Sequence, residues 1–304
     1  PTAVGTAFIE LMGRIAESET GTYKIIMRNV SFLQPLAIDI GEALTVAARV
    51  EPSGPGFKVS VCGKPPKGVE EFIYAQGFIE PNTVSQPAPL DIPGVRARCA
   101  SELPGYSDTP ALVTGPRWKT REKISAGKGE WLVELRLPEM FAQESGDYLF
   151  HPAMMDAAVN TMTQRLGDGL YLPLHYRKIT IFDKLPASIV CHIAQSGMES
   201  ADGSAEMLSF DVIIADTSGR VLVVADAYTV KRARSFERTR EKYHGVVWAV
   251  KPQLPEPGGR LLHVIILSDG SASSISLENA FKDMAPATGV SYWESCPEKR
   301  ASSW

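Results

Sequence analysis

The sequence predicts an α+β fold made of two similar halves, each a helix followed by antiparallel strands. Three observations predict it. The order helix-then-strands occurs twice along the chain. The strand segments are short, rich in β-branched and aromatic residues, and separated by clusters of Gly, Pro and Ser. A stretch rich in Pro, Ser and Asp lies between the two series. A helix that packs on one face of an antiparallel sheet buries the apolar side of both.

The first half opens with a helix at residues 6–15 (TAFIELMGRI), where apolar residues recur at three- and four-residue spacing. Four strands are predicted to follow, at 23–33, 43–50, 57–62 and 71–79. Residues 80–110 show no sustained periodicity and read as a linker.

The second half repeats the pattern, with a strand at 130–137 and a helix at 151–165 whose first turn tolerates Pro152. Its remaining strands are predicted at 178–182, 188–194, 207–215 and 221–231. The residues DTSG at 216–219 favour a turn between the last two. The predicted organisation is a first half over 1–95, a linker over 96–110, a second half over 111–235 and a connector over 236–304.

Composition and charge exclude several classes of protein. Thirty-one basic and 35 acidic residues give a net charge of −4, which argues against a nucleic-acid binder and against an anionic membrane surface as partner. The four cysteines form no CxxC pair, so neither a zinc site nor a disulfide framework is indicated, and a reducing, cytoplasmic setting is expected. No stretch of about 18 apolar residues predicts a membrane span.

The sharpest local signal is the segment 150–160, FHPAMMDAAVN. Asp156 and Asn160 are four residues apart and share one face of the predicted helix, so Asn160 is expected to hold the Asp156 carboxyl by a hydrogen bond. The neighbouring residues are apolar, and an apolar wall disfavours the charged form of a carboxyl group. A carboxyl that stays protonated near neutral pH can act as a general acid. The alternative from spacing alone is a solvated first-turn carboxylate favoured by the helix dipole.

This segment resembles the second dehydratase motif of polyketide synthases and animal-type fatty acid synthases, His-Pro-x-x-x-Asp-x-x-x-Gln/His. His151, Pro152 and Asp156 match the motif, and Asn160 departs from its last residue.

Further segments carry the resemblance over about residues 4–235. The residues TGPRW at 114–118 are similar to the family's Tyr-Gly-Pro-x-Phe, with Gly115 and Pro116 matched, Thr114 in place of the Tyr and Trp118 keeping an aromatic ring. YLP at 171–173 stands where the family has a Leu-Pro before its next strand. GRVLVVADAYTVKRA at 219–233 resembles the closing hairpin, and GTAFIEL at 5–11 and NVSFLQPLAI at 29–38 resemble the first helix and the strand after it.

The resemblance implies a double hotdog, two antiparallel sheets each wrapped around a helix. It also implies dehydration of a β-hydroxyacyl thioester on an acyl carrier protein, within a modular polyketide synthase. Asp156 would be the acid, and His151, Pro152 and Asn160 would form the pocket beside it. Four further residues are expected to contact substrate: Gly115, Pro116, Leu172 and Pro173. No metal or redox cofactor is implied, because the phosphopantetheine arm belongs to the carrier. The expected partners are the carrier protein, neighbouring synthase domains and a second copy of the chain.

One part of the family's machinery is missing from the sequence. The family uses a His of the first half as general base, and the five histidines of this chain all lie at or after His151. Alignment of GTAFIEL places the base before Pro1, so we expect a chain cut through a longer polypeptide. Two alternatives stay open: an inactive dehydratase-like domain that serves as scaffold or carrier-docking module, and a double-bond isomerase or cyclase on the same fold.

Three further residues give weaker signals. Tyr74 stands where a family strand has a His, and it is either a tunnel-wall residue or an ordinary strand residue. His175 is expected on a half-exposed loop, within reach of the acyl chain. Trp248, in HGVVWAVKP, resembles the entry to a ketoreductase structural region, which makes residues 236–304 a candidate for the start of such a subdomain.

Overall fold

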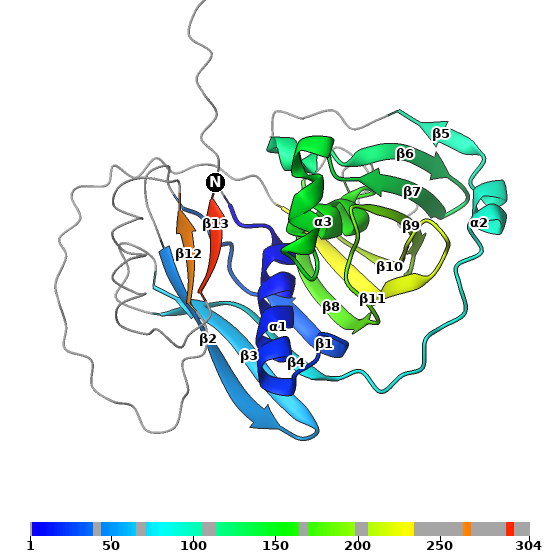
Figure 1. Ribbon diagram of the computed structural model, residues 1–304. Coiled ribbons are helices and arrows are strands. Elements are labelled where there is room, and N and C mark those ends of the chain that lie inside the picture. Colours follow the sequence, from blue (N-terminus) through cyan, green and yellow to red (C-terminus); the bar gives the residue numbers. More distant parts are fainter. Residues whose placement is uncertain are drawn as a thin grey trace, which may run out of the picture. The chain divides into compact units, whose positions relative to one another are not determined.

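The computed structural model describes the chain over residues 2–38, 44–64, 71–104, 114–163, 170–197 and 206–233, and as backbone alone over 264–268 and 290–294 (Figure 1). Its helical elements are α1 (Gly5–Thr20), α2 (Ile92–Arg98), α3 (Pro152–Asn160) and the 3-10 helices η1 (Pro116–Trp118) and η2 (Glu139–Gly146). Within the described residues, no helix combines the length and apolar character needed to cross a lipid bilayer.

The strands belong to two compact units. The larger unit consists of Val4–Phe32 and Gly77–Arg238. The smaller unit consists of Pro1–Ala3, Leu33–Gln76 and Thr239–Trp304, so strand β4 (Phe72–Pro81) begins in the smaller unit and ends in the larger. The other strands of the larger unit are β1 (Ile25–Phe32), β5 (Ser101–Leu103), β6 (Arg121–Ala126), β7 (Glu130–Arg136), β8 (Tyr171–Ile181), β9 (Ser188–Gln195), β10 (Met207–Ala215) and β11 (Val221–Arg232).

In the larger unit the strands follow the spatial order β4-β1-β8-β11-β10-β9-β7-β6-β5. Strand β1 pairs antiparallel with β8, with Ile26 opposite Thr180. A strand from the first part of the sequence therefore continues the sheet formed by the second part. Local patterns do not predict this pairing, because strand partners are chosen by the register of distant segments.

Helix α1 forms where the sequence predicts it and extends five residues further. Phe8, Ile9, Met12 and Ile15 are buried at helical spacing. The helix ends at Gly21, whose φ of 73° lies in the left-handed region and whose N–H donates to the Glu17 carbonyl.

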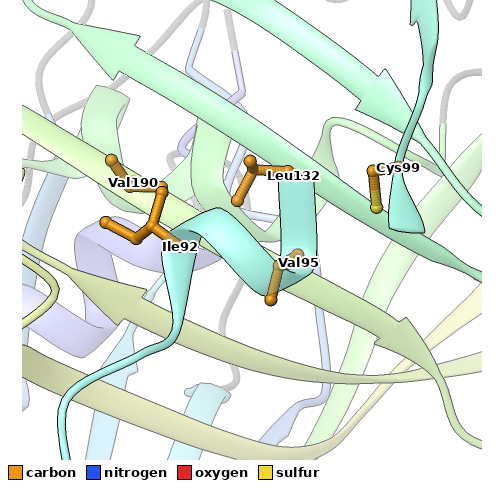
Figure 2. Packing of buried hydrophobic residues seen from close by; sticks show 5 residues of the cluster. All are labelled: Ile92, Val95, Cys99, Leu132 and Val190. Atoms are coloured by element: carbon orange, nitrogen blue, oxygen red, sulfur yellow. The ribbon is translucent and has the colours of Figure 1, made fainter. Parts of the chain in front are cut away.

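The prediction of a linker has to be corrected, because residues 92–103 contain helix α2 and strand β5. Asp91 caps α2 by accepting a hydrogen bond from the Gly94 N–H at 3.0 Å. The helix packs through a small apolar cluster onto strands β7 and β9 (Figure 2), formed by Ile92, Val95, Cys99, Leu132 and Val190. Three apolar residues, Ile92, Val95 and Cys99, form too short a pattern to stand out in a segment rich in Pro and Ser.

Other element boundaries differ from the sequence predictions by a few residues. Strand β6 was not predicted, and β8 starts seven residues earlier than expected, at Tyr171. Pro173 falls inside β8 at a level where β1 no longer pairs, so its missing N–H breaks no hydrogen bond on that side. Helix α3 ends at Asn160, and residues 164 and 165 of the predicted helix lie outside the described residues.

In the smaller unit, β2 (Leu44–Ser53) and β3 (Gly56–Gly63) form a hairpin, and β12 (Val264–Ser268) pairs with β2 and, in parallel, with β13 (Val290–Glu294). Trp248 and the histidines at 244 and 263 lie outside the described residues. The interpretation of 236–304 as the start of a ketoreductase subdomain stays a prediction.

Candidate active site

Asp156 lies in the second turn of α3 and is half-buried, while the residues around it on the helix are fully buried. Met154, Met155, Ala157 and Val159 are at most 1% exposed. The carboxyl group therefore borders an apolar wall and retains access to solvent or substrate.

Both oxygens of the Asp156 carboxyl accept a hydrogen bond. The Asn160 amide Nδ2 donates to Oδ1 at 2.7 Å, which is the contact that the four-residue spacing predicts. The indole Nε1 of Trp118 donates to Oδ2 at 2.8 Å. Trp118 is the last residue of η1 and comes 38 residues before Asp156 in the sequence. The carboxyl is thus oriented from two sides by neutral donors.

Tyr228 fixes the orientation of the Asn160 amide. Its hydroxyl donates to Asn160 Oδ1 at 2.5 Å, which leaves the amide nitrogen directed at Asp156. The Tyr228 ring stacks on Tyr176 with ring centroids 4.4 Å apart. Burial raises the pKa of both phenols well above the ordinary value, and the charge of Asp156 adds to the effect. Both hydroxyls therefore stay protonated and remain hydrogen-bond donors at neutral pH.

A bulge in β11 sits next to Tyr228. The register of β10 and β11 shifts between Phe210 and Val212, so that two residues of β11 oppose one of β10. Ala227 takes a φ of 48°, in the left-handed region, and its N–H donates to Asp211 Oδ1 at 2.8 Å. The bulge changes the alternation of side chains along β11 where Tyr228 enters the core.

His151 precedes α3 and is almost completely buried. Its Nε2 lies 3.3 Å from the Glu144 carboxylate, and its Nδ1 is buried without a hydrogen-bond partner among the described residues. Burial lowers the pKa of the His151 imidazole, an effect that Glu144 opposes. A neutral ring that donates from Nε2 to Glu144 fits this environment.

Glu144, on η2, also binds Arg117 of η1 through two hydrogen bonds, Nε to Oε2 at 2.8 Å and Nη2 to Oε1 at 2.7 Å. The guanidinium lies over the Phe141 ring, 4.4 Å from its centroid. Arg117 holds the pKa of Glu144 below its ordinary value. Because Arg117 immediately precedes Trp118, this ion pair ties the segment that carries the indole donor to the residue that contacts His151.

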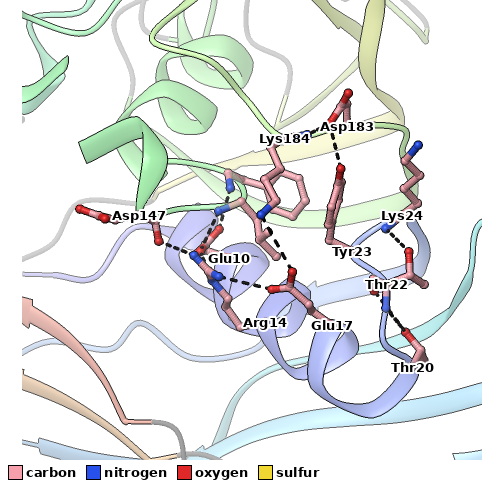
Figure 3. Close-up of polar contacts among 12 residues, drawn as sticks. Glu10, Arg14, Glu17, Thr20, Thr22, Tyr23, Lys24, Asp147, Asp183 and Lys184 are labelled. Atoms are coloured by element: carbon pink, nitrogen blue, oxygen red, sulfur yellow. Dashed lines mark hydrogen bonds and ion pairs between the residues drawn. The ribbon is translucent and has the colours of Figure 1, made fainter. Parts of the chain in front are cut away.

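Helix α1 holds the start of α3 and the chain before it through three polar residues spaced four apart, Thr6, Glu10 and Arg14. Figure 3 shows the contacts of Glu10 and Arg14. Thr6 Oγ1 donates to the Pro152 carbonyl at 3.0 Å. The buried Glu10 carboxylate accepts the backbone N–H groups of Leu149 at 3.1 Å and Phe150 at 2.7 Å. Arg14 donates to the Asp147 carbonyl. These contacts fix the start of α3, and with it the direction of the Asp156 side chain.

The remaining predicted site residues have different surroundings. Gly115 and Pro116 are exposed and form the turn that begins η1, in which the Trp118 N–H donates to the Gly115 carbonyl at 3.0 Å. Leu172 and Pro173 lie in β8, and Leu172 is 36% exposed. Their aliphatic side chains cannot join the hydrogen bonds around Asp156, so their substrate contact stays a prediction.

His175 and Tyr74 also differ from each other. His175 is on strand β8 rather than on a loop, and its Nδ1 lies 3.1 Å from Ser31 Oγ. Desolvation lowers the pKa of this imidazole. Tyr74 is a buried residue of β4 that belongs to the smaller unit. The tunnel-wall role of Tyr74 stays a prediction.

Sequence reasoning missed the roles of Trp118 and Tyr228. The sequence indicates an aromatic ring at position 118, but nothing in it indicates a hydrogen bond from Trp118 to Asp156. Tyr228 had one available signal: it is the single aromatic residue of strand β11, and a buried Tyr usually needs a partner for its hydroxyl. The described residues contain no group of three or more His, Cys, Asp or Glu placed to hold a metal ion.

This geometry is suited to proton transfer at one carboxyl group. The two donors, the indole and the amide, cannot take a proton from Asp156. The carboxyl can therefore exchange its proton with a bound substrate while its orientation is preserved.

Comparison with known proteins shows which family the second half of the chain is similar to. Residues 96–240 match the family model described as the polyketide synthase dehydratase N-terminal domain. Over this stretch, just under half of the chain, the sequence is similar to a polyketide synthase dehydratase domain. Among curated relatives, the chain is 27% identical over 153 residues to polyketide synthase PksN of Bacillus subtilis, covering 49% of this chain and 3% of that protein. It is 26% identical over 164 residues to the highly reducing polyketide synthase stpks1 of Strobilurus tenacellus, covering 50% of this chain and 6% of that protein. The chain spans less than a tenth of the length of these relatives.

Solved structures confirm the double-hotdog fold of the chain. The dehydratase domain from the CurF module of the curacin polyketide synthase superposes with a TM-score of 0.67 and 22% identity, over 77% of this chain and 85% of that chain. A trans-AT polyketide synthase dehydratase domain from Brevibacillus brevis gives a TM-score of 0.67 and 18% identity, over 77% and 86%. The predicted α+β double hotdog is confirmed.

Proposed function

We propose that this domain dehydrates a β-hydroxyacyl thioester carried on an acyl carrier protein, as one step of a modular polyketide synthase. The observation that carries the proposal is Asp156. This carboxyl sits at an apolar wall, in a His-Pro-x-x-x-Asp segment, with each oxygen held by a neutral donor. The partners would be the carrier protein and the neighbouring domains of the synthase, in the cytoplasm. The phosphopantetheine of the carrier would present the substrate, with no cofactor held by this domain.

In the proposed reaction a base removes the proton at Cα, the Cα=Cβ double bond forms, and the C–O bond at Cβ breaks. Asp156 gives its proton to the departing hydroxyl, which leaves as water, and the resulting carboxylate is reprotonated before the next turnover. Hydroxide is a poor leaving group, so a positioned acid contributes about 10²–10⁴-fold to the rate. The resemblance implies a His of the first half as the base.

The fixed orientation of the acid supports the proposal. Trp118 and Asn160 restrict the rotation of the carboxyl, and Glu10, Thr6 and Arg14 hold the start of its helix. Orientation of a reacting group lowers the entropic part of the barrier. Related proteins point the same way: an aspartate-to-asparagine variant and a histidine-to-phenylalanine variant of the CurK dehydratase are described as inactive.

The test is Asp156→Asn in the synthase polypeptide that carries this domain, assayed with a β-hydroxyacyl pantetheine thioester. Dehydration should fall by about 10²–10⁴-fold, because Asn keeps the shape of the side chain and cannot supply the proton. Asp147→Asn is the matched control, since that carboxyl is exposed, lies nine residues earlier and should be dispensable. Full activity of Asp156→Asn would remove this residue from the mechanism.

The second candidate function is a non-catalytic scaffold or carrier-docking domain. It is favoured by the absence of histidine from residues 1–150 and by the Asn at position 160. If the unaltered protein turns over neither β-hydroxyacyl nor enoyl thioesters, the scaffold is the better description. Turnover of enoyl thioesters alone, by movement of the double bond, would indicate an isomerase.

A further inference from the structure

The contact between Trp118 and Asp156 joins two segments that no local pattern connects. The indole N–H donates to Oδ2 at 2.8 Å, and both residues are half-buried. An indole N–H can donate but cannot accept, so the bond is strongest when Asp156 is ionised. Donation to a carboxylate favours its charged form. The apolar wall of α3 acts in the opposite direction, because desolvation favours the neutral form.

We propose that Trp118 is a positioning residue that acts through Oδ2 of Asp156 and sets the pH at which this group loses its proton. The inference rests on the proposed function, in which the protonated carboxyl is the acid. A donor on Oδ2 limits how far the apolar wall can favour the neutral form. This donor therefore makes the protonated carboxyl a stronger acid towards a departing hydroxyl than the apolar wall alone would allow.

Trp118 can play this role because its segment is anchored independently of Asp156. The bidentate ion pair of Arg117 with Glu144, at 2.7 and 2.8 Å, fixes the residue next to it. The turn from Gly115 places Trp118 at the end of η1. On the other side of the carboxyl, Tyr228 fixes the Asn160 amide. The two donors are thus held by different parts of the fold, and either can be removed without removing the other.

Other titratable groups near α3 have to be considered before a pH effect is assigned to Asp156. Tyr176 and Tyr228 face it and stay protonated, since burial raises the pKa of both. Just before α3, His151 contacts Glu144. Most charged groups of the other elements that pack on α3 have partners of their own: Glu10 with the amides of residues 149 and 150, Arg14 with Glu17, Arg117 with Glu144, Glu130 with Arg98, Glu134 with Arg96, and Asp211 with the Ala227 N–H. Glu19 of α1 and Arg136 of β7 are exposed.

The experiment is the pH dependence of dehydration in Trp118→Phe, which keeps an aromatic ring and removes the N–H. The alkaline limb of the kcat profile, where the acid loses its proton, should move to higher pH by about one unit, because the carboxylate loses a donor. Trp131→Phe is the matched control. Trp131 lies on β7 with an edge contact to Phe210 at 6.3 Å, so the limb should not move. An alkaline limb that stays in place in a folded, active Trp118→Phe variant would overturn the proposal.

A second measurement does not depend on that variant or on turnover. In protein labelled with nitrogen-15 tryptophan, one of the five indole resonances should titrate, and Asp156→Asn should abolish that titration. If no indole resonance responds to Asp156→Asn, the coupling is absent and the inference fails. If the coupling is present and no variant dehydrates substrate, the inference about Trp118 stands and the proposed function fails.

Discussion

Two clusters of the same three residue types lie in the larger unit and differ in what surrounds them. Arg117, Glu144 and His151, here the site cluster, lie beside the residues that contact Asp156. Arg98, Glu130 and His192, here the helix cluster, join α2 to strands β7 and β9. In each cluster the Arg binds the Glu through two hydrogen bonds and the His Nε2 approaches the same carboxylate.

Burial separates the two clusters. His151 is 2% exposed with Nδ1 unpartnered among the described residues, and its distance to Glu144 is 3.3 Å. His192 lies nearer the surface, 2.8 Å from Glu130. Arg98, followed by His192, lowers the pKa of Glu130 to about 2. The same chemistry therefore anchors a surface helix in one place and fixes the surroundings of a reactive carboxyl in the other.

The largest difference should appear in activity. Glu144→Gln weakens the ion pair with Arg117 and the contact with His151. The positions of Trp118 and of the start of α3 are then less firmly held. We expect kcat/KM for dehydration to fall by about 10-fold or more, because small displacements of a catalytic group are costly. Glu130→Gln, the matched change in the helix cluster, should keep activity within about twofold. Equal losses of kcat/KM in the two variants would mean that the site cluster and the helix cluster contribute equally to activity.

A smaller difference should appear in the pH dependence of stability. The pKa of Glu130 is lowered in the folded protein to about 2, from an unfolded value near 4.5. Its contribution is therefore present above about pH 4.5 and is lost as the pH falls towards 2. We expect Glu130→Gln to lower the free energy of unfolding by about 1 kcal/mol at pH 6, after allowance for solvent screening, and by less at pH 3. Urea unfolding at pH 6 and pH 3 measures the two free energies. An equal loss at both pH values would contradict a lowered pKa of Glu130 in the folded protein.

The smallest effect is expected from His151. The pKa of this imidazole is lowered in the folded protein, so the unfolded chain takes up the proton first as the pH falls below about 6.5. Stability should therefore decrease from pH 7 to pH 5, and the decrease should be shallower in His151→Gln. The His192→Gln variant keeps the buried imidazole of His151. It should therefore retain the part of the decrease in stability between pH 7 and pH 5 that comes from His151. Identical slopes in the unaltered protein and His151→Gln, by thermal unfolding, would count against a neutral buried ring.

Prediction from sequence worked where the signal is local. The helix at 6–15, the strand at 207–215 and the turn at 216–219 follow from spacing and turn residues. The hydrogen bond between Asp156 and Asn160 follows from two positions four apart on one helix. Helix α2 was missed because its short apolar face becomes meaningful only against Leu132 and Val190, which lie far along the chain.

The sequence by itself determined the order of helices and strands, the α+β class and the segment that carries Asp156, because these depend on residues within a few positions of one another. Only the tertiary structure decided which side chains surround that carboxyl. Trp118 lies 38 residues before Asp156, and Tyr228 lies 68 residues after Asn160. Their meeting depends on strand register, on the bulge at Ala227 and on the ion pair of Arg117, none of which a local pattern encodes.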